Sequence, residues 1–148
     1  MRRQHAVWGL ALIVLTLGFA TSCGKKSSSN ATTTSTSASM PVAVADVDLG
    51  RAIGVDKRVT DKASDFRPND TIYASVHTTG SSSDAKLKAR WTFEDGQVVD
   101  ETEQAIAPNG DAVTEFHVAK ADGWPAGKYK LEVFLNGSSV STKDFEVK

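Results

Sequence analysis

Apolar and polar residues alternate along most of the chain that follows residue 43. The segment 85–93 shows the pattern most clearly, because its even positions are Lys86, Lys88, Arg90 and Thr92 while its odd positions are apolar. Alternation with a period of two predicts a β-strand with one face buried and the other in solvent. The inward side chains would then be Ala85, Leu87, Ala89, Trp91 and Phe93.

The same period recurs through the segment 44–148, and no stretch of it has the apolar stripe of a helix. Turn signals separate the alternating runs, and Asn136-Gly137 is the strongest because both residues accept a positive φ. About seven short strands in one domain predict an all-β fold, a single antiparallel β-sandwich. The predicted strands lie around residues 46–49, 71–78, 85–93, 97–107, 112–119, 128–135 and 139–147.

The last predicted strand interrupts its own alternation. Val140 and Thr142 share one parity, whereas Phe145 and Val147 share the other. A regular strand cannot bury both pairs on one face, so we expect a β-bulge near Lys143-Asp144.

A basic tip and a short apolar run open the chain. Residues 6–20 are almost wholly apolar and as a helix would span about 22 Å, less than the roughly 30 Å of a bilayer core. Behind Arg2 and Arg3, such a run predicts a secretory signal peptide over residues 1–22. The small residues 20–22 directly before Cys23 resemble the lipobox of bacterial lipoproteins. This resemblance implies that Cys23 is acylated and anchors the mature chain to a membrane.

The residues after Cys23 bear on the compartment and on the reach of the anchor. Inner-membrane retention in many Gram-negative bacteria is associated with Asp after the cysteine, so Gly24 favours the outer membrane. Because of Lys25 and Lys26, a location in the inner membrane remains the alternative. The linker, residues 23–43, contains a Ser- and Thr-rich run that cannot bury enough surface to fold, which predicts a disordered tether. Its reach as a coil is about 20–25 Å.

Several residues of the segment 44–148 resemble those of immunoglobulin-like (Ig-like) sandwiches. Trp91 takes the place of the inward tryptophan on the third strand, and Tyr129, after Gly127, resembles the tyrosine-corner residue. The runs 66–73 (FRPNDTIY) and 124–129 (WPAGKY) are similar to segments of small beta-proteobacterial lipoproteins. The resemblance implies an Ig-like fold and a location in the cell envelope, and it implies no activity.

Composition excludes several classes of function. The chain of 148 residues has a net charge of −1, and removal of residues 1–22 leaves 15 basic against 18 acidic residues, a net charge of −3. Nucleic-acid-binding domains are usually strongly basic, so no nucleic-acid partner is expected. Cys23 is the only cysteine, which excludes an intrachain disulfide and a Cys-rich zinc site. We expect no cofactor.

The residues that could carry chemistry do not form a catalytic pattern. His77 and His117 lack a metal-binding spacing, and no serine stands in a G-x-S-x-G motif. The acidic residues within 94–103 surround a predicted turn and an exposed strand, where carboxylates are usually solvated. We therefore expect no enzymatic activity. A groove with convergent carboxylates, or with both histidines, would instead favour a small glycan-acting enzyme or an accessory domain of one.

Cationic side chains gather on the outward positions of two strands that are neighbours in an Ig-like sandwich. We expect a basic face on one sheet and an acidic face on the other. The basic face would bind an anionic partner, such as an anionic glycan, lipid head groups or an acidic envelope protein. The alternative is that the lysines only protect the sheet against aggregation. The predicted basic face consists of Lys86, Lys88, Arg90, Lys128, Lys130 and Lys143, and the predicted acidic face of Asp46, Asp48, Glu101, Glu103 and Glu115.

Three aromatic residues are candidate contacts for a ligand. Phe134 has the outward parity of a charged strand, Trp124 lies in a loop flanked by Gly and Pro, and Tyr73 has an outward position in its strand. A flat aromatic row would indicate a carbohydrate-binding module. Alternatively, Trp124 folds over one end of the sandwich and Phe134 packs under the tether or a loop.

These patterns together predict a lipid-anchored protein of the cell envelope that presents a non-enzymatic Ig-like binding or assembly module. Its membrane contact is the lipid on Cys23, and its partner is an envelope protein or an anionic glycan.

Overall fold

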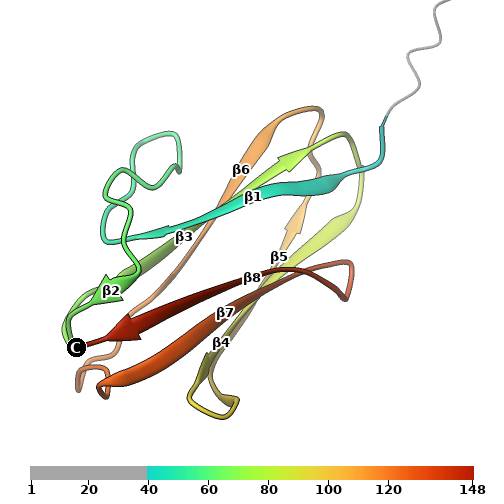
Figure 1. The fold of residues 1–148 in the computed structure, drawn as a ribbon. Helices are drawn as coiled ribbons and strands as arrows, with labels where there is room; N and C mark the ends of the chain where they lie inside the picture. Colours follow the sequence, from blue (N-terminus) through green and yellow to red (C-terminus); the bar gives the residue numbers. More distant parts are fainter. Residues whose placement is uncertain (1–39) are drawn as a thin grey trace, which may run out of the picture. The chain divides into compact units, whose positions relative to one another are not determined.

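Strands and turns make up the part of the chain that the computed structural model describes, residues 40–148 (Figure 1). The predictions for the signal peptide 1–22, for Cys23 and for the linker up to residue 39 lie outside these residues. Residues 40–148 contain no helix with the length and apolar character needed to cross a membrane. The eight strands are β1 (Ala43–Gly50), β2 (Asp65–Phe66), β3 (Ile72–Thr79), β4 (Ala85–Phe93), β5 (Gln97–Ile106), β6 (Ala112–Val118), β7 (Gly127–Leu135) and β8 (Ser138–Val147).

The seven predicted strands are all present, and in β4 the burial follows the predicted alternation. In β4, the side chains of Leu87, Ala89 and Trp91 are at most 1% exposed, whereas Lys86 faces solvent. The sequence pattern does not predict β2, because two residues are too few for a period to show. This short strand pairs in parallel with the end of β8.

The strands form two sheets. One has three strands in the order β1-β3-β6, and the other has five in the order β2-β8-β7-β4-β5. Every pairing except that of β2 with β8 is antiparallel. β4 and β7 are neighbours, as expected, and Trp91 lies opposite Leu131 between them. The predicted all-β sandwich is thereby confirmed (Figure 1).

An aromatic cluster joins the strands of the five-stranded sheet inside the core. The ring of Phe145 stacks on Tyr129 at 5.3 Å between centroids. It also meets Trp91 and Phe66 edge-on, at 5.9 and 5.5 Å. The facing sheet contributes aliphatic side chains from β3, which are completely buried. Offset and edge-on aromatic pairs add to the energy of apolar burial, so this cluster stabilises the pairing of β4, β7 and β8.

The loop before β7 is folded over one end of the core. The Tyr129 hydroxyl donates a hydrogen bond to the carbonyl of Pro125 at 2.8 Å, which is the tyrosine-corner contact that the sequence predicts. Trp124 is 4% exposed, its indole Nε1 donates to the carbonyl of Asp70 at 3.0 Å, and its ring meets Tyr129 edge-on. Burial raises the pKa of the Tyr129 hydroxyl, and the charge of Glu94 raises it further.

Three strands contain a β-bulge. In β8 the extra residue is Val140, because Val133 lies opposite Ser141 while the next residue of β7 lies opposite Ser139. The prediction of a bulge near Lys143-Asp144 is therefore wrong in position. The bulge reverses which residues of β8 face inward, close to the hairpin turn, and Val140 itself is 44% exposed. The other two bulges lie at Ala45 in β1 and at Val99 in β5.

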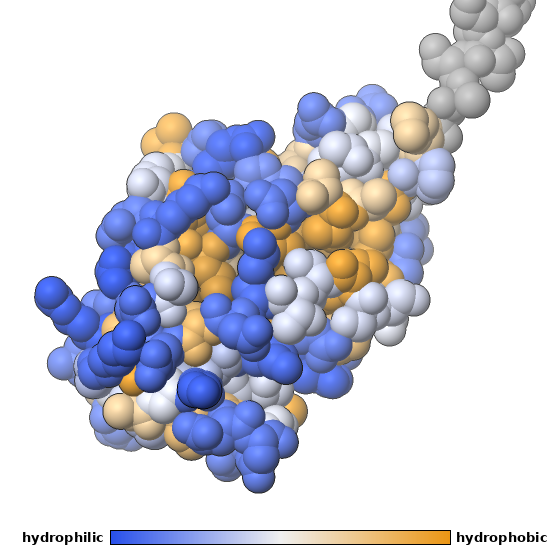
Figure 2. Space-filling model, in the orientation of Figure 1, coloured by the Kyte–Doolittle hydropathy of each residue, from blue (hydrophilic) through white to orange (hydrophobic). Residues whose placement is uncertain are grey.

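A seam between the two sheets runs along β1 and β8. Figure 2 shows hydrophobic residues at the surface along this seam, interrupted by hydrophilic side chains. Lys143 of β8 crosses the seam to Asp46 of β1, with 3.7 Å between Nζ and Oδ1. This ion pair joins β1 and β8 across the seam.

We expect the Tyr129→Phe substitution to lower the free energy of unfolding by about 1–2 kcal/mol, because it leaves the Pro125 carbonyl without its donor. The matched control is Tyr73→Phe, since the Tyr73 hydroxyl has no hydrogen bond within residues 40–148. Urea unfolding of both variants measures the difference. Equal losses of stability would show that the corner hydrogen bond contributes nothing specific.

Candidate functional site

The cations of β4 are neutralised by acidic residues of the adjacent strand. Lys86 Nζ lies 3.3 Å from Glu103 Oε1, and Lys88 Nζ lies 3.3 Å from Glu101 Oε1. Arg90 donates from Nε to the second oxygen of Glu101. The prediction that Glu101 and Glu103 lie on the opposite sheet is wrong, because the turn at 94–96 returns the chain as β5 beside β4. The outer face of the five-stranded sheet therefore carries both signs of charge.

The remaining predicted cations are divided between two surfaces. Lys128 and Lys130 of β7 are exposed on the outer face, and within residues 40–148 neither has a carboxylate at ion-pair distance. Lys143 lies opposite the buried Leu131, so its side chain has the inward parity and reaches Asp46 instead. Lys143 is therefore not part of the outer face.

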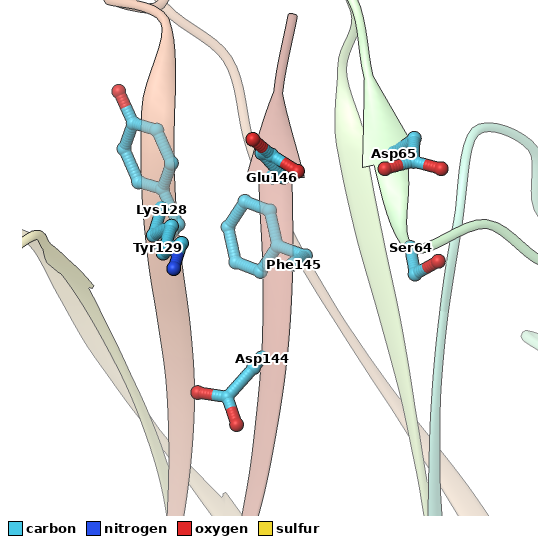
Figure 3. A pocket seen from close by; sticks show the side chains of 7 residues that line it. All are labelled: Ser64, Asp65, Lys128, Tyr129, Asp144, Phe145 and Glu146. Carbon is cyan, nitrogen blue, oxygen red and sulfur yellow. The ribbon is translucent and has the colours of Figure 1, made fainter.

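A hollow of about 450 Å³ lies beside Lys128, where β7, β8 and β2 come together (Figure 3). Asp65, Asp144 and Glu146 line it together with Ser64 and the aromatic residues Tyr129 and Phe145. Lys148 is paired with two of these acids, at 2.9 Å from Asp65 and 3.4 Å from Glu146, and these hydrogen bonds raise the pKa of its amine. The hollow offers mixed charges and does not concentrate cations for an anionic ligand.

The three candidate aromatic contacts do not form a row. Phe134 is outward on the five-stranded sheet, as predicted, and two cations lie against its ring, Lys88 Nζ and Arg90 Cζ, each 4.9 Å from the centroid. Trp124 is part of the core, in agreement with the structural alternative. Tyr73 lies on the outer face of the other sheet beside His117, with ring centroids 5.7 Å apart. The flat aromatic surface of a carbohydrate-binding module is not formed by these residues.

The outer face of the three-stranded sheet carries both histidines of residues 40–148, together with hydroxyl and carboxylate side chains. Cross-strand register places Asp46 and Val113 beside His77, Asp48 and Glu115 beside Ser75, and His117 beside Tyr73. Asp46, Asp48 and Glu115 lie on this sheet as predicted. We call this surface the polar face; its members are Asp46, Asp48, Tyr73, Ser75, His77, Glu115 and His117.

A hairpin-like arm, residues 51–62, lies over the polar face. Its two sides are joined by backbone hydrogen bonds, including Arg51 N to Asp61 O at 2.9 Å and Thr60 N to Ala52 O at 3.0 Å. Gly50 at its base is required by the close approach, because a Cβ there would lie 2.1 Å from the Asp61 carbonyl oxygen. The sequence pattern does not predict the arm, since the segment has no alternation and is held by side-chain contacts with β1 and β3.

Three polar contacts dock the arm. The Ser75 hydroxyl, which is fully buried, donates to the carbonyl of Lys57 at 2.7 Å. Arg58 Nη1 lies 2.9 Å from His77 Nδ1. Lys62 Nζ lies 2.7 Å from Asp48 Oδ1, and this hydrogen bond raises the pKa of the Lys62 amine. The basic arm thus covers part of an acidic surface of the same molecule.

The two histidines occupy separate environments. His77 and His117 lie four positions apart in the register of β3 with β6, which corresponds to about 13 Å along the sheet. His117 Nδ1 pairs with Glu115 Oε1 at 2.8 Å at the edge of β6, where Gln104 of β5 also donates to the Glu115 carbonyl. Among residues 40–148, no three His, Cys, Asp or Glu side chains come together as a metal site.

Comparison with known proteins identifies the fold and no family. No protein-family model matches the sequence, and no curated protein sequence is significantly similar to it. An immunoglobulin-like protein from Pseudomonas aeruginosa has a similar structure, with a TM-score of 0.53 and 15% sequence identity. The match covers 75% of this chain and 99% of that one.

Parts of larger enzymes match less closely. One is an alkylpurine DNA glycosylase from Pseudomonas fluorescens, with 11% identity, a TM-score of 0.46 and 69% of this chain matched to 30% of the enzyme. Another is a β-glucosidase from Listeria innocua, with 8% identity, a TM-score of 0.45 and 69% of this chain matched to 16% of the enzyme. The chain therefore contains an Ig-like β-sandwich, and these matches assign no activity to it.

The carboxyl of Glu101 provides a test of the charge pairing on the outer face. The hydrogen bond from Arg90 lowers the pKa of Glu101, and Lys88 lowers it further. In the Arg90→Gln variant we expect the pKa of Glu101 to rise toward its ordinary value, as followed by NMR titration of the carboxyl carbon. Because the pairing lowers the folded-state pKa, its stabilisation is present above the unfolded-state pKa and is lost as pH falls through the folded value.

The matched control for this titration is Lys130→Gln, which removes one cation from the same face without touching Glu101. A titration of Glu101 that is the same in the parent and in Arg90→Gln would contradict the pairing.

Proposed function

We propose that this protein is a lipid-anchored module of the bacterial cell envelope that binds or assembles with another envelope component without enzymatic activity. The observation that carries the proposal is the order of segments in the sequence. A basic tip, a short apolar run, Cys23, a Ser- and Thr-rich linker and a β-sandwich follow one another directly. A cysteine that bears acyl chains needs such a leader before it and such a spacer after it.

The anchoring part of the proposal rests on Cys23. Two or three acyl chains, at about 0.8 kcal/mol for each buried CH₂, hold a protein at a membrane where one chain would exchange. Gly24 supports the outer membrane as the destination. The linker gives the domain about 20–25 Å of reach, enough to stand clear of the lipid head groups.

The chain enters the domain at one end of the sandwich, and the arm lies at the other end. Met40 accepts a hydrogen bond from Ser81 N, and Gly110 N donates to Gly80 O, so two turns share the end of the sandwich where β1 begins. The arm follows the far end of β1, and β8 runs in the same direction toward the C-terminus (Figure 1). The arm and the C-terminus therefore lie at the end of the sandwich opposite Met40.

The binding part of the proposal is supported by the chemistry of the surfaces. The described side chains with acid–base chemistry are dispersed or paired with one another, which suits recognition rather than catalysis. Lys128 and Lys130 are the cations of the predicted basic face that remain available to a partner. We propose that an acidic envelope protein or an anionic glycan contacts this surface.

The Cys23→Ser variant tests the anchor. We expect the parent protein in the membrane fraction, with the added mass of acyl chains on its N-terminal peptide, and the variant in the soluble fraction. Ser28→Ala is the matched control, because it changes the linker and leaves residues 20–23 intact. Equal membrane association of parent and Cys23→Ser, with no lipid mass on the parent, would refute the anchor.

Charge reversal at Lys128 and Lys130 tests the partner. Crosslinking in native envelopes, followed by mass spectrometry, should capture a partner from the parent and lose it from the double Lys→Glu variant. The control is Lys86→Glu, at a cation that is already paired within the chain. If the double variant captures the same partner as well as the parent does, the contact surface lies elsewhere.

A further inference from the structure

His77 holds the tip of the arm through a contact that requires a neutral imidazole. Its Nδ1 lies 2.9 Å from Arg58 Nη1, and a guanidinium can only donate. Nδ1 must therefore accept, which places the ring proton on Nε2. That atom is buried and has no hydrogen-bond partner within residues 40–148, since Asp48 Oδ2, at 3.7 Å, is too distant.

Charged groups face His77 from both sides. On β1, Asp46 lies opposite it and Asp48 lies beside it. The arm contributes Arg58 directly, Lys62 through its ion pair with Asp48, and Lys57 through its carbonyl contact with the neighbouring Ser75. On β6 its cross-strand partner is the uncharged Val113, and Glu115 is one register step away. The arm also contributes Asp56, whose Oδ2 lies 3.6 Å from Arg58 Nε, whereas the charged residues that the sheet places near His77 are all anions.

Protonation of His77 changes the balance of these contacts. A protonated Nδ1 can no longer accept from Arg58, and an imidazolium in contact with a guanidinium is repelled by it. Asp48 attracts the imidazolium from a greater distance, and its charge is already compensated by Lys62. The imidazolium is therefore more stable beside Asp46 and Asp48 when the Arg58 side chain has left.

We propose that the arm is a latch that opens when His77 becomes protonated. The released part is the tip, residues 54–58, which the Arg58 contact and the Ser75 hydrogen bond hold against β3, whereas the buried Val59, bridged to Ile53, stays with the base. The base stays in place, because Arg51 and Ala63 keep their backbone bonds to Asp61 and Leu49. Opening exposes Ser75 and His77, so that this part of the polar face is open to solvent in acid and covered at neutral pH.

Amide hydrogen exchange of the full chain in detergent micelles tests the latch. We expect the peptide that covers residues 51–62 to be protected at about pH 8 and to lose protection by about tenfold or more at about pH 5, after correction for the intrinsic rate, since an imidazole becomes charged across this interval. The loop 119–126, at the same end of the domain, serves as the internal reference.

Three variants separate the latch from a general effect of acid. His77→Gln offers Arg58 an acceptor that cannot be protonated, so its arm should stay protected at both pH values. Arg58→Gln should lose protection at both, and His117→Gln should behave like the parent. Equal protection of the parent arm at both pH values overturns the proposal, as does a pH response that persists in His77→Gln.

Discussion

The packing of Phe145 against Trp91, Tyr129 and Phe66 is the interaction on which the rest of the structure depends. These rings come from β8, β4, β7 and β2, so one cluster fixes the order of the five-stranded sheet and closes the core. Tyr129 also links this cluster to the loop before β7. Its hydroxyl donates to Pro125, and its ring packs against Trp124 at the end of the sandwich. Among the described residues, the buried core cluster extends from Val47 to Val147, with Val44 packed against it.

On both outer surfaces, oppositely charged side chains of the chain pair with one another, although Lys128 and Lys130 have no such partner within residues 40–148. On the five-stranded sheet, β5 brings Glu101 and Glu103 against the cations of β4. On the three-stranded sheet, the arm brings Arg58 and Lys62 against a polar face of carboxylates and histidine. The two charge pairings differ in how firmly the backbone holds them. The first pairing joins neighbouring strands of a continuous ladder, whereas the second depends on a short arm that few side chains hold in place, and only the second can be undone without disturbing the sandwich.

Local pattern predicts most of the fold and little of the surface. The strands are predictable because inward positions such as Leu87, Trp91 and Leu131 repeat with the period of a half-buried sheet. The partner of β5 is not given by that period, although the short turn at Asp95-Gly96 indicates a hairpin within one sheet. The arm depends on side-chain contacts with β1 and β3, and the bulge at Val140 on the register of the β7–β8 hairpin, and the alternation of apolar residues encodes neither. For the same reason, the sequence does not decide whether Trp124 contacts a ligand or packs in the core.

The edge strands β1, β5 and β6 are each interrupted, as is the part of β8 that the two-residue β2 leaves uncovered. β1, β5 and β8 each contain a bulge, at Ala45, Val99 and Val140, and the edge of β6 has a carbonyl occupied by Gln104. A bulged edge does not offer the even spacing of donors and acceptors that a foreign strand needs to dock. A second copy of the domain therefore meets no regular row of donors and acceptors by which it could extend either sheet at β1 or β5.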